Sequence, residues 1–226
     1  MSNDFKSVKD FLAKFDKKEE KKKSQKNQKN TKDLKLFSFI ESGKFKGKKL
    51  RLPSLETTRS TKSIVKACVF NVLRTNLRDK IFIEAFGGSA LMAAEALSNN
   101  ALKAYAIEFD KKAYEIAAQN AKIIDENLII LHGDTFKILP TFVEKIEQEF
   151  VLYFDPPFSI REGFCDIYER VYALIENLNT THLVQFIIEH HSYITTPQNL
   201  CNFTRVKLKK FGATSLSFYE KLDKTF

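Results

Sequence analysis

The sequence predicts an α/β fold: a Rossmann-like, mostly parallel sheet covered by helices on both faces. From residue 80 onward, short and almost wholly apolar runs alternate with amphipathic stretches, the pattern of parallel strands buried on both faces. With 226 residues, 43% of them apolar, the chain is long enough for one domain with a small appendage. This composition argues against a disordered chain and against a disulfide-stapled secreted module.

The positive charge lies at the front of the chain. Residues 1–80 hold 23 Lys and Arg against 9 Asp and Glu, whereas the remaining residues hold 14 against 19. A basic front end on a mildly acidic globular unit favours a polyanionic partner such as nucleic acid. Biased codon usage is the alternative explanation for the lysine-rich tail.

Three features bear on the compartment. No apolar run approaches the roughly 18 to 20 residues that cross a bilayer, and the N-terminus carries no apolar signal stretch. The 3 Cys are far apart and contain no CxxC pair, so neither a zinc site nor a disulfide is expected. We expect a cytoplasmic, monomeric protein that binds no membrane and no metal.

We divide the chain into three parts. Residues 1–35 are a Lys-rich tail, in which Phe and Leu at helical spacing predict a short amphipathic helix. Residues 36–79 are a basic part that we expect to bind nucleic acid, with a β-hairpin around a Ser42-Gly43 turn and then a helix that begins at Arg59. The second hairpin strand carries Lys44, Lys46, Lys48, Lys49 and Arg51, and the helix is expected to bury Ile64, Ala67, Cys68, Val72 and Leu73.

Residues 80–226 form the sheet domain. Strands are expected within 81–86, 103–109, 127–134, 150–154 and 182–190, with helices within 89–100, 111–124, 135–149 and 162–177. The chain then ends in two strands joined at Phe211-Gly212, which predicts a final antiparallel hairpin.

The first motif with chemical meaning is EAFGGSA, residues 84–90. An apolar strand runs into a Gly-Gly turn and then a helix, so a cofactor can approach backbone amides at the helix N-terminus. The spacing is not the GxGxxG of dinucleotide sites. A short loop that begins with acidic Glu84 better suits a cofactor built from an amino acid and a nucleoside, such as S-adenosylmethionine. An ordinary strand-to-helix turn is the alternative.

Two further acidic residues follow the next strands. Glu108 ends the second strand, where an acidic side chain accepts hydrogen bonds from ribose hydroxyls in Rossmann-type sheets. Asp134, in the GDTF segment, could accept from the exocyclic amine of adenine. Helix capping is the alternative for both positions, and Asp110 could cap in place of Glu108.

The most specific motif is FDPPF, Phe154–Phe158. Two prolines cannot continue a sheet ladder, so the strand stops and exposes Asp155 at the edge where ligands of open α/β sheets bind. The Asp155 carboxylate and the Pro156 carbonyl can accept the two N–H groups of a planar amine, while Phe158 stacks on the base. The motif therefore predicts methyl transfer to a nucleobase amine, by positioning and by charge stabilisation.

Together these motifs resemble the RsmD-type family, the bacterial methyltransferases that modify the N2 amine of a guanine in small-subunit (16S) ribosomal RNA. The matching segments run from GKFKGKKL through FNVL, the glycine turn, EALS and DPPF to FGATSLSFY, over roughly residues 38–220. The family usually has Asp at the position of Glu84, glycine at Ala90, and Arg-Pro-Thr where residues 59–61 read Arg-Ser-Thr.

The resemblance implies a class I methyltransferase fold with seven strands, and S-adenosylmethionine as methyl donor. The implied partner is ribosomal RNA, in the small subunit or its assembly intermediate. The expected catalytic residues are Asp155, Pro156, Pro157 and Phe158. The expected cofactor-binding residues are Glu84, Phe86, Gly87, Gly88, Ser89, Glu108, Phe109, Asp134 and Thr135. The expected RNA-binding residues are Lys44, Lys46, Lys48, Lys49, Arg51, Arg59 and Thr61.

Two other functions fit the same motifs. A DNA amino-methyltransferase acting on adenine N6 or cytosine N4 also uses a DPPF-like motif, although this chain has no evident large target-recognition region. A non-catalytic RNA-binding assembly factor could keep the fold, and Ala90 in the glycine turn is the feature that favours it.

Overall fold

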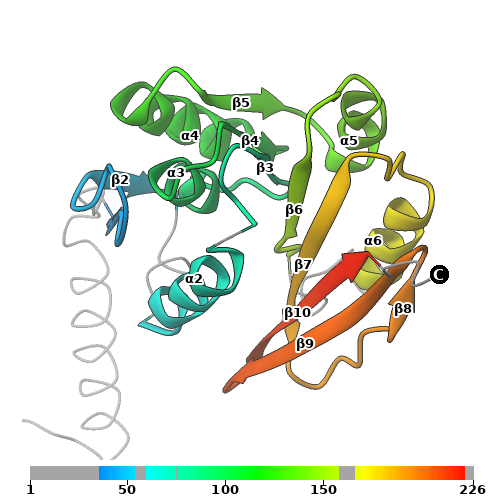
Figure 1. Cartoon of the computed structure of the whole chain (residues 1–226). Coiled ribbons are helices and arrows are strands. Elements are labelled where there is room, and N and C mark those ends of the chain that lie inside the picture. The colour runs from blue at the N-terminus through cyan, green and yellow to red at the C-terminus, as the bar shows by residue number, and fades with distance from the viewer. Residues whose placement is uncertain (1–35, 54–59, 75, 158–165, 222–226) are drawn as a thin grey trace, which may run out of the picture. The chain divides into compact units, whose positions relative to one another are not determined.

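A computed structural model describes residues 36–53, 60–74, 76–157 and 166–221, which belong to one compact unit. Its strands form a large main sheet and a separate small one (Figure 1). The strands of that sheet are β3 (Ile81–Glu84), β4 (Lys103–Glu108), β5 (Leu128–His132), β6 (Phe150–Phe154), β7 (Leu183–His191), β8 (Asn199–Leu200), β9 (Phe203–Phe211) and β10 (Thr214–Lys221).

Within the described residues, this sheet has eight strands in the order β5-β4-β3-β6-β7-β10-β9-β8. The first five are parallel to one another, and β10 lies antiparallel between β7 and β9. The predicted α/β fold with a final antiparallel hairpin is thereby confirmed. The expected count of seven strands omits the two-residue β8, which is too short to show as an apolar run.

Helices cover both faces of the sheet (Figure 1). On one face lie α2 (Ser60–Leu73), α3 (Leu91–Ser98) and α4 (Lys111–Ile124), which pack on Phe82, Tyr153 and other buried side chains. On the other lie α5 (Thr135–Val143) and α6 (Ile167–Glu176), which pack on Ile83 and Phe154. Both faces of β3 and β6 are therefore buried, and this explains why their sequences are almost wholly apolar.

The N-terminal hairpin differs from the expectation. β1 (Leu36–Phe39) pairs antiparallel with β2 (Lys49–Leu52) in a separate two-stranded sheet. Lys44, Lys46 and Lys48 therefore lie in the connection, not on the second strand, and the tight turn falls after Gly43. The chain leaves the ladder early because residues 41–45 bond to the C-terminal half of α3 instead.

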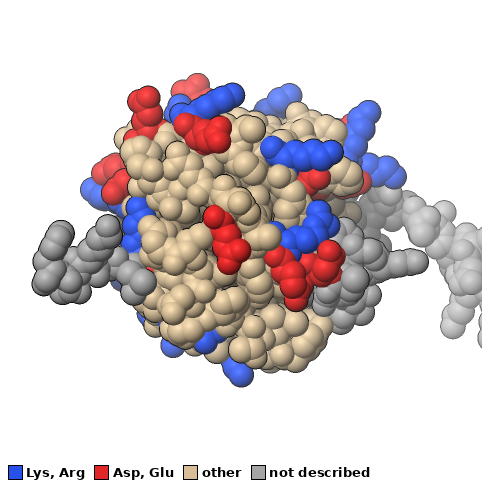
Figure 2. Space-filling view, turned by 90° about the vertical axis from the view of Figure 1, so that its right-hand side faces the viewer, with Lys and Arg blue, Asp and Glu red and all other residues tan. Residues whose placement is uncertain are grey.

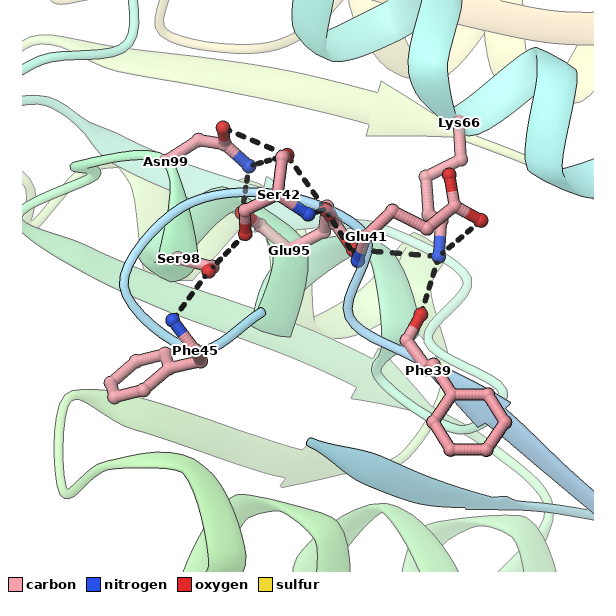
Figure 3. Close-up of polar contacts among 8 residues, drawn as sticks. All are labelled: Phe39, Glu41, Ser42, Phe45, Lys66, Glu95, Ser98 and Asn99. Carbon is pink, nitrogen blue, oxygen red and sulfur yellow. Dashed lines mark hydrogen bonds and ion pairs between the residues drawn. The ribbon is translucent and has the colours of Figure 1, made fainter. Parts of the chain in front are cut away.

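Glu95 of α3 organises this connection (Figure 3). Its carboxylate is buried and accepts from the backbone N–H groups of Glu41 and Ser42, at 2.9–3.1 Å. The Nζ of buried Lys66 in α2 lies 3.4 Å from the Glu95 carboxylate and 3.2 Å from that of Glu41, and donates to the Phe39 carbonyl. One charged cluster thus joins the hairpin, α2 and α3.

The buried face predicted for α2 is wrong in part. Ile64 is 58% exposed, Ala67 is exposed, and Cys68 and Val72 are only half-buried. The helix instead buries Val65, Lys66, Val69, Phe70 and Leu73. The buried face is thus the neighbouring apolar stripe of the same helix, and it also contains Lys66, whose charge is paired with Glu41 and Glu95 inside the molecule.

Several expectations fall outside the described residues: the amphipathic helix within 1–35, Arg59, Phe158, and the helix start at Glu162. The described part of the last long helix, α6, begins at Ile167. In the described parts of the chain, no helix is both long and apolar enough to cross a membrane.

Candidate active site

Carboxylates converge where three neighbouring parallel strands end. Glu84 ends β3, Glu108 ends β4, and Asp155 follows β6. The negative charges of Asp155 and Glu108 both contribute to raising the pKa of Glu84, so each of the two carboxylates lies within electrostatic reach of Glu84. The structure therefore brings together Glu84, Glu108 and Asp155, three of the four acidic residues that the motifs single out, at the edge where open α/β sheets bind ligands.

The glycine turn after β3 is built for close approach. The Gly87 N–H donates to the Ile107 carbonyl at 2.7 Å, and a Cβ at Gly87 would lie 3.0 Å from that of Ala106. Gly88 has φ +51° and open space where its Cβ would be. Ala90 adopts the left-handed conformation, φ 59°, at the start of α3, a conformation that costs a non-glycine residue about 1–2 kcal/mol. The turn is therefore as tight as the glycine pattern suggests.

Glu84 lies under the N-terminus of α3. Its Oε2 accepts from the Ala93 N–H at 2.9 Å, and its side chain is buried. Burial, the largest cause, together with the negative charges of Asp155 and Glu108, raises the pKa of Glu84 to about 8, although the helix N–H groups act to lower it. An acid in this state favours a cationic ligand, because a positive charge nearby would stabilise its ionised form.

Glu108 links the second strand to the glycine turn. Its carboxylate accepts from the Gly88 N–H at 2.6 Å and from the Asp110 N–H at 2.7 Å. Asp110 caps α4, since its side chain accepts from Ala113. The capping alternative for Glu108 is therefore taken by Asp110. Next to Glu108, Phe109 is 75% exposed and presents an aromatic ring at the tip of the strand.

The loop after β5 contacts the glycine turn after β3. Asp134 caps α5 by accepting from the Phe136 N–H at 3.0 Å, so the capping alternative is realised at this position. The Thr135 hydroxyl donates to the Ala85 carbonyl, and the rings of Phe86 and Phe136 meet edge-on, 6.0 Å between centroids. Ser89 is buried, and its carbonyl accepts from Asn120 at 2.9 Å.

The Asp-Pro-Pro segment follows β6 as predicted. The strand ends at Phe154, Asp155 and Pro157 are half-buried, and Pro156 is buried. Behind Asp155 the Tyr153 hydroxyl donates to the Glu189 carboxylate of β7. Burial and the Glu189 charge hold the pKa of Tyr153 well above its usual value. The sequence analysis missed this pair, although an acidic residue inside the apolar run FIIEHH was a visible signal.

The basic hairpin residues lie elsewhere. Lys48 donates to the carbonyls of Ile123 and Ile124 at the C-terminus of α4, and Lys44 pairs with Asp125 at 3.6 Å. That end of α4 leads into the start of β5, at the opposite edge of the sheet from Asp155. The structure thus does not bring Lys44 and Lys48 together with the acidic edge.

The other predicted RNA contacts differ among themselves. Arg51 donates to Gln119 on α4 at 2.6 Å, and Lys49 lies over the Phe37 ring, 3.8 Å from its centroid. Lys46 is exposed in the connection. The side chain of Thr61 lies outside the described residues, as Arg59 does. Among the described residues, no group of three or more His, Cys, Asp or Glu is arranged to hold a metal ion.

The strand order, the glycine turn after β3 and the acidic tips of β3 and β4 define a class I methyltransferase, a class of enzymes that takes S-adenosylmethionine as methyl donor. A family model described as Conserved hypothetical protein 95 matches residues 39–220. The chain belongs to this family, and the resemblance to RsmD-type methyltransferases is confirmed.

Similar proteins of known name and similar solved structures are also methyltransferases. Ribosomal RNA small subunit methyltransferase D of Haemophilus influenzae is 26% identical over 187 residues, which are 80% of this chain and 92% of the relative. The Escherichia coli K12 protein of the same name is 28% identical over 139 residues, 61% of this chain and 67% of that one. A solved Escherichia coli structure described as a methyltransferase, yhhF, is 25% identical with a TM-score of 0.64 and covers 82% of this chain and 98% of its own.

Proposed function

We propose that this protein transfers a methyl group from S-adenosylmethionine to the N2 amine of a guanine in small-subunit ribosomal RNA. The observation that carries the proposal is the meeting of Asp155 with the acidic tips of β3 and β4 at one edge of the sheet. Relatives named as small-subunit ribosomal RNA methyltransferases support the RNA substrate. Such a substrate is found where ribosomes assemble, in the cytoplasm.

The residues fit the proposed cofactor. S-adenosylmethionine has a sulfonium and an ammonium group, and the raised pKa of Glu84 shows a buried acidic site that a cation would stabilise. Gly88 leaves open space at the turn. Glu84 and Glu108 would line the pocket from β3 and β4, and exposed Phe109 would pack on the adenine ring. A methyltransferase that is 12% identical and shares the fold, with a TM-score of 0.57, was solved with SAH.

When bound, S-adenosylmethionine supplies an electrophilic methyl group. The protein's own part is to hold the guanine amine in line with that methyl group. The Asp155 carboxylate and the Pro156 carbonyl would each accept one N–H and so aim the nitrogen lone pair. The new methyl–nitrogen bond would form as the methyl–sulfur bond of the donor breaks, and Asp155 would stabilise the positive charge that develops on the nitrogen until the amine loses one proton to solvent. Phe158 would stack on the base. The buried Tyr153–Glu189 pair supports the strand ends behind Asp155.

The test is methyl transfer to small ribosomal subunits purified from a strain that lacks the corresponding enzyme. We expect Asp155→Asn to lower the rate by about 10²-fold or more, since one charge-stabilising contact is lost, with S-adenosylmethionine binding nearly unchanged in calorimetry. Glu147→Gln, an exposed carboxylate between α5 and β6, is the matched control. Equal labelling by the wild type and Asp155→Asn would refute the catalytic role.

The position of the methyl group is a separate readout. Digestion of the labelled RNA to nucleosides and mass spectrometry should find N2-methylguanosine. Label on another base would contradict the guanine-N2 assignment while leaving the methyltransferase activity intact. Preferential labelling of DNA would instead favour an amino-methyltransferase of DNA.

A further inference from the structure

We propose that three exposed lysines of β9, Lys207, Lys209 and Lys210, form a phosphate-binding surface that holds the RNA strand next to the target nucleotide. The inference rests on the proposed function and extends it, because it assigns RNA contacts to the C-terminal hairpin. The charge pattern of the sequence predicts RNA contacts in the N-terminal part, because the residues beyond 80 have a small excess of acidic side chains.

The register of the sheet carries these lysines to the active-site edge. Glu84 pairs with Tyr153, and the same row continues through Ile187 and Phe218 to Lys207. Lys209 lies two residues further along β9, in the same row as Glu189 of β7. Phe154 pairs with Ile188, the residue before Glu189, so the row of Glu189 and Lys209 is also the row of Asp155. Asp155 and Lys209 are therefore three strand positions apart, about 14 Å at the usual strand spacing.

Alternation along the strands decides which face the lysines use. Phe218 and Leu216, the partners of Lys207 and Lys209, belong to the same buried face as Tyr153. Lys207 and Lys209 thus lie on the side of the sheet that carries α2, which packs beside β9 (Figure 1). Their charges reach Cys68 of α2 and act against the effect of burial, which raises the pKa of that thiol. Lys210 lies on the other side, where its charge contributes to lowering the pKa of buried His190.

The charges are available to a partner. All three lysines are exposed, and among the described residues none of them forms an ion pair. By contrast, Lys44 and Lys48 of the hairpin are engaged with the end of α4. The face of the molecule in Figure 2 shows no such run of basic side chains: there, acidic and basic side chains are interspersed around a broad uncharged area. A run of unpaired cations at the active-site edge suits the phosphates of a nucleic acid.

A structural explanation exists for the same lysines. Beyond Arg205, no described strand pairs with the outer edge of β9, and Val206 and Leu208 are 53% and 41% exposed. Lysines on an open edge hinder edge-to-edge aggregation. That role needs charge of either sign, whereas phosphate binding needs positive charge. Charge reversal therefore separates the two explanations.

The experiment measures the affinity of the full chain for small ribosomal subunits at several salt concentrations. The subunits come from a strain that lacks the corresponding methyltransferase, and no S-adenosylmethionine is added. Three proteins are compared with the wild type: the triple Lys→Gln variant at 207, 209 and 210, the triple Lys→Glu variant at the same positions, and a control triple Lys→Gln variant. The control changes exposed Lys103, Lys122 and Lys145, which lie at the opposite edge of the sheet, and it removes the same amount of positive charge.

We expect the Lys→Gln variant to bind at least about tenfold more weakly, with the slope of log affinity against log salt reduced by about 2, roughly 0.7 for each lost phosphate contact. The Lys→Glu variant should stay monodisperse and bind more weakly still, and the control should resemble the wild type. Thermal melts verify folding, and Lys209→Gln alone replaces the triple variant if that variant melts early.

Three results would overturn the proposal. The first is an unchanged affinity of the Lys→Gln variant for subunits, and the second is an equal loss of affinity in the control variant. The third is that the Lys→Gln variant aggregates while the Lys→Glu variant binds subunits as tightly as the wild type. Calorimetry with S-adenosylmethionine keeps the proposed function separate. If the wild type fails to bind the cofactor or to transfer methyl, yet the affinity for subunits depends on the β9 lysines, the surface stands and the enzymatic proposal falls.

Discussion

Glu84 shows how one side chain can serve the fold and the site at once. Its carboxylate accepts from a backbone N–H of the first turn of α3, and it also faces the negative charges of Asp155 and Glu108. Burial makes ionisation of the Glu84 carboxyl costly, and a cationic ligand beside it would lower that cost by stabilising the ionised form. This property belongs to the position at the end of β3, which is buried on both faces.

The first prediction at this scale concerns pH. The pKa of Glu84 is raised to about 8 in the folded protein, so the folded state binds more protons than the unfolded state between the ordinary pKa and that value. The stabilising contribution is therefore complete at acidic pH and is lost as the pH rises toward 8, with a slope of up to about 1.4 kcal/mol per pH unit. Glu84→Gln should remove this slope. Urea unfolding from pH 5 to 8 measures it, and parallel curves for the two proteins would contradict the prediction.

At the scale of elements, the cluster of Lys66, Glu95 and Glu41 holds the N-terminal hairpin to α2 and α3 (Figure 3). The hairpin forms a two-stranded sheet of its own, which is marginally stable without packing. The backbone N–H groups of Glu41 and Ser42 reach their acceptors only on α3. The connection, with its lysines, is therefore positioned by a buried carboxylate 53 residues away in the sequence.

The second prediction tests that cluster. Glu95→Ala leaves Lys66 buried with one carboxylate fewer and should lower the free energy of unfolding by about 3–5 kcal/mol. Adding Lys66→Met should restore much of the loss, because an apolar side chain needs no ionic partner. Urea unfolding followed by circular dichroism measures both, with exposed Glu115→Ala on α4 as control. A cost for Glu95→Ala no larger than that of Glu115→Ala would show that the cluster adds nothing.

At the scale of the whole molecule, the loops that follow three separate strands are joined to one another at one edge of the sheet. Glu108 joins the β4 tip to the glycine turn, and Thr135 joins the loop after β5 to the residue that follows β3. These cross-links hold the edge of the sheet before any ligand arrives. A ligand bound there touches several strands at once and stabilises them together.

The third prediction follows from that arrangement. S-adenosylmethionine at one hundred times its dissociation constant should stabilise the fold by about 2.7 kcal/mol, which is roughly 5–10 °C in melting temperature for a domain of this size. Asp155→Asn should keep this shift because Asp155 faces the substrate amine, whereas Glu108→Ala should lose most of it. Differential scanning calorimetry gives the values. No shift in the wild type with millimolar ligand would contradict the assignment of the cofactor site.

The strands, the helices and the edge that carries the site could be predicted from the sequence, because their causes are local. Apolar runs such as FVLYF mark buried parallel strands, the Gly-Gly turn follows from backbone sterics, and two prolines end β6. The carboxyl ends of parallel strands meet at one edge, so the order of motifs already placed Glu84, Glu108 and Asp155 near one another.

Only the tertiary structure decided which charges are buried and which are available. Lys66 lies inside the molecule because Glu95 and Glu41 neutralise it there, so the buried face of α2 includes a charged residue that no apolar pattern predicts. The lysines of the hairpin connection sit at the far edge, whereas Lys209 of β9 is brought level with the active site by the register of three strands. Ion pairing and strand register join residues that are distant in the chain, and local patterns carry no information about either.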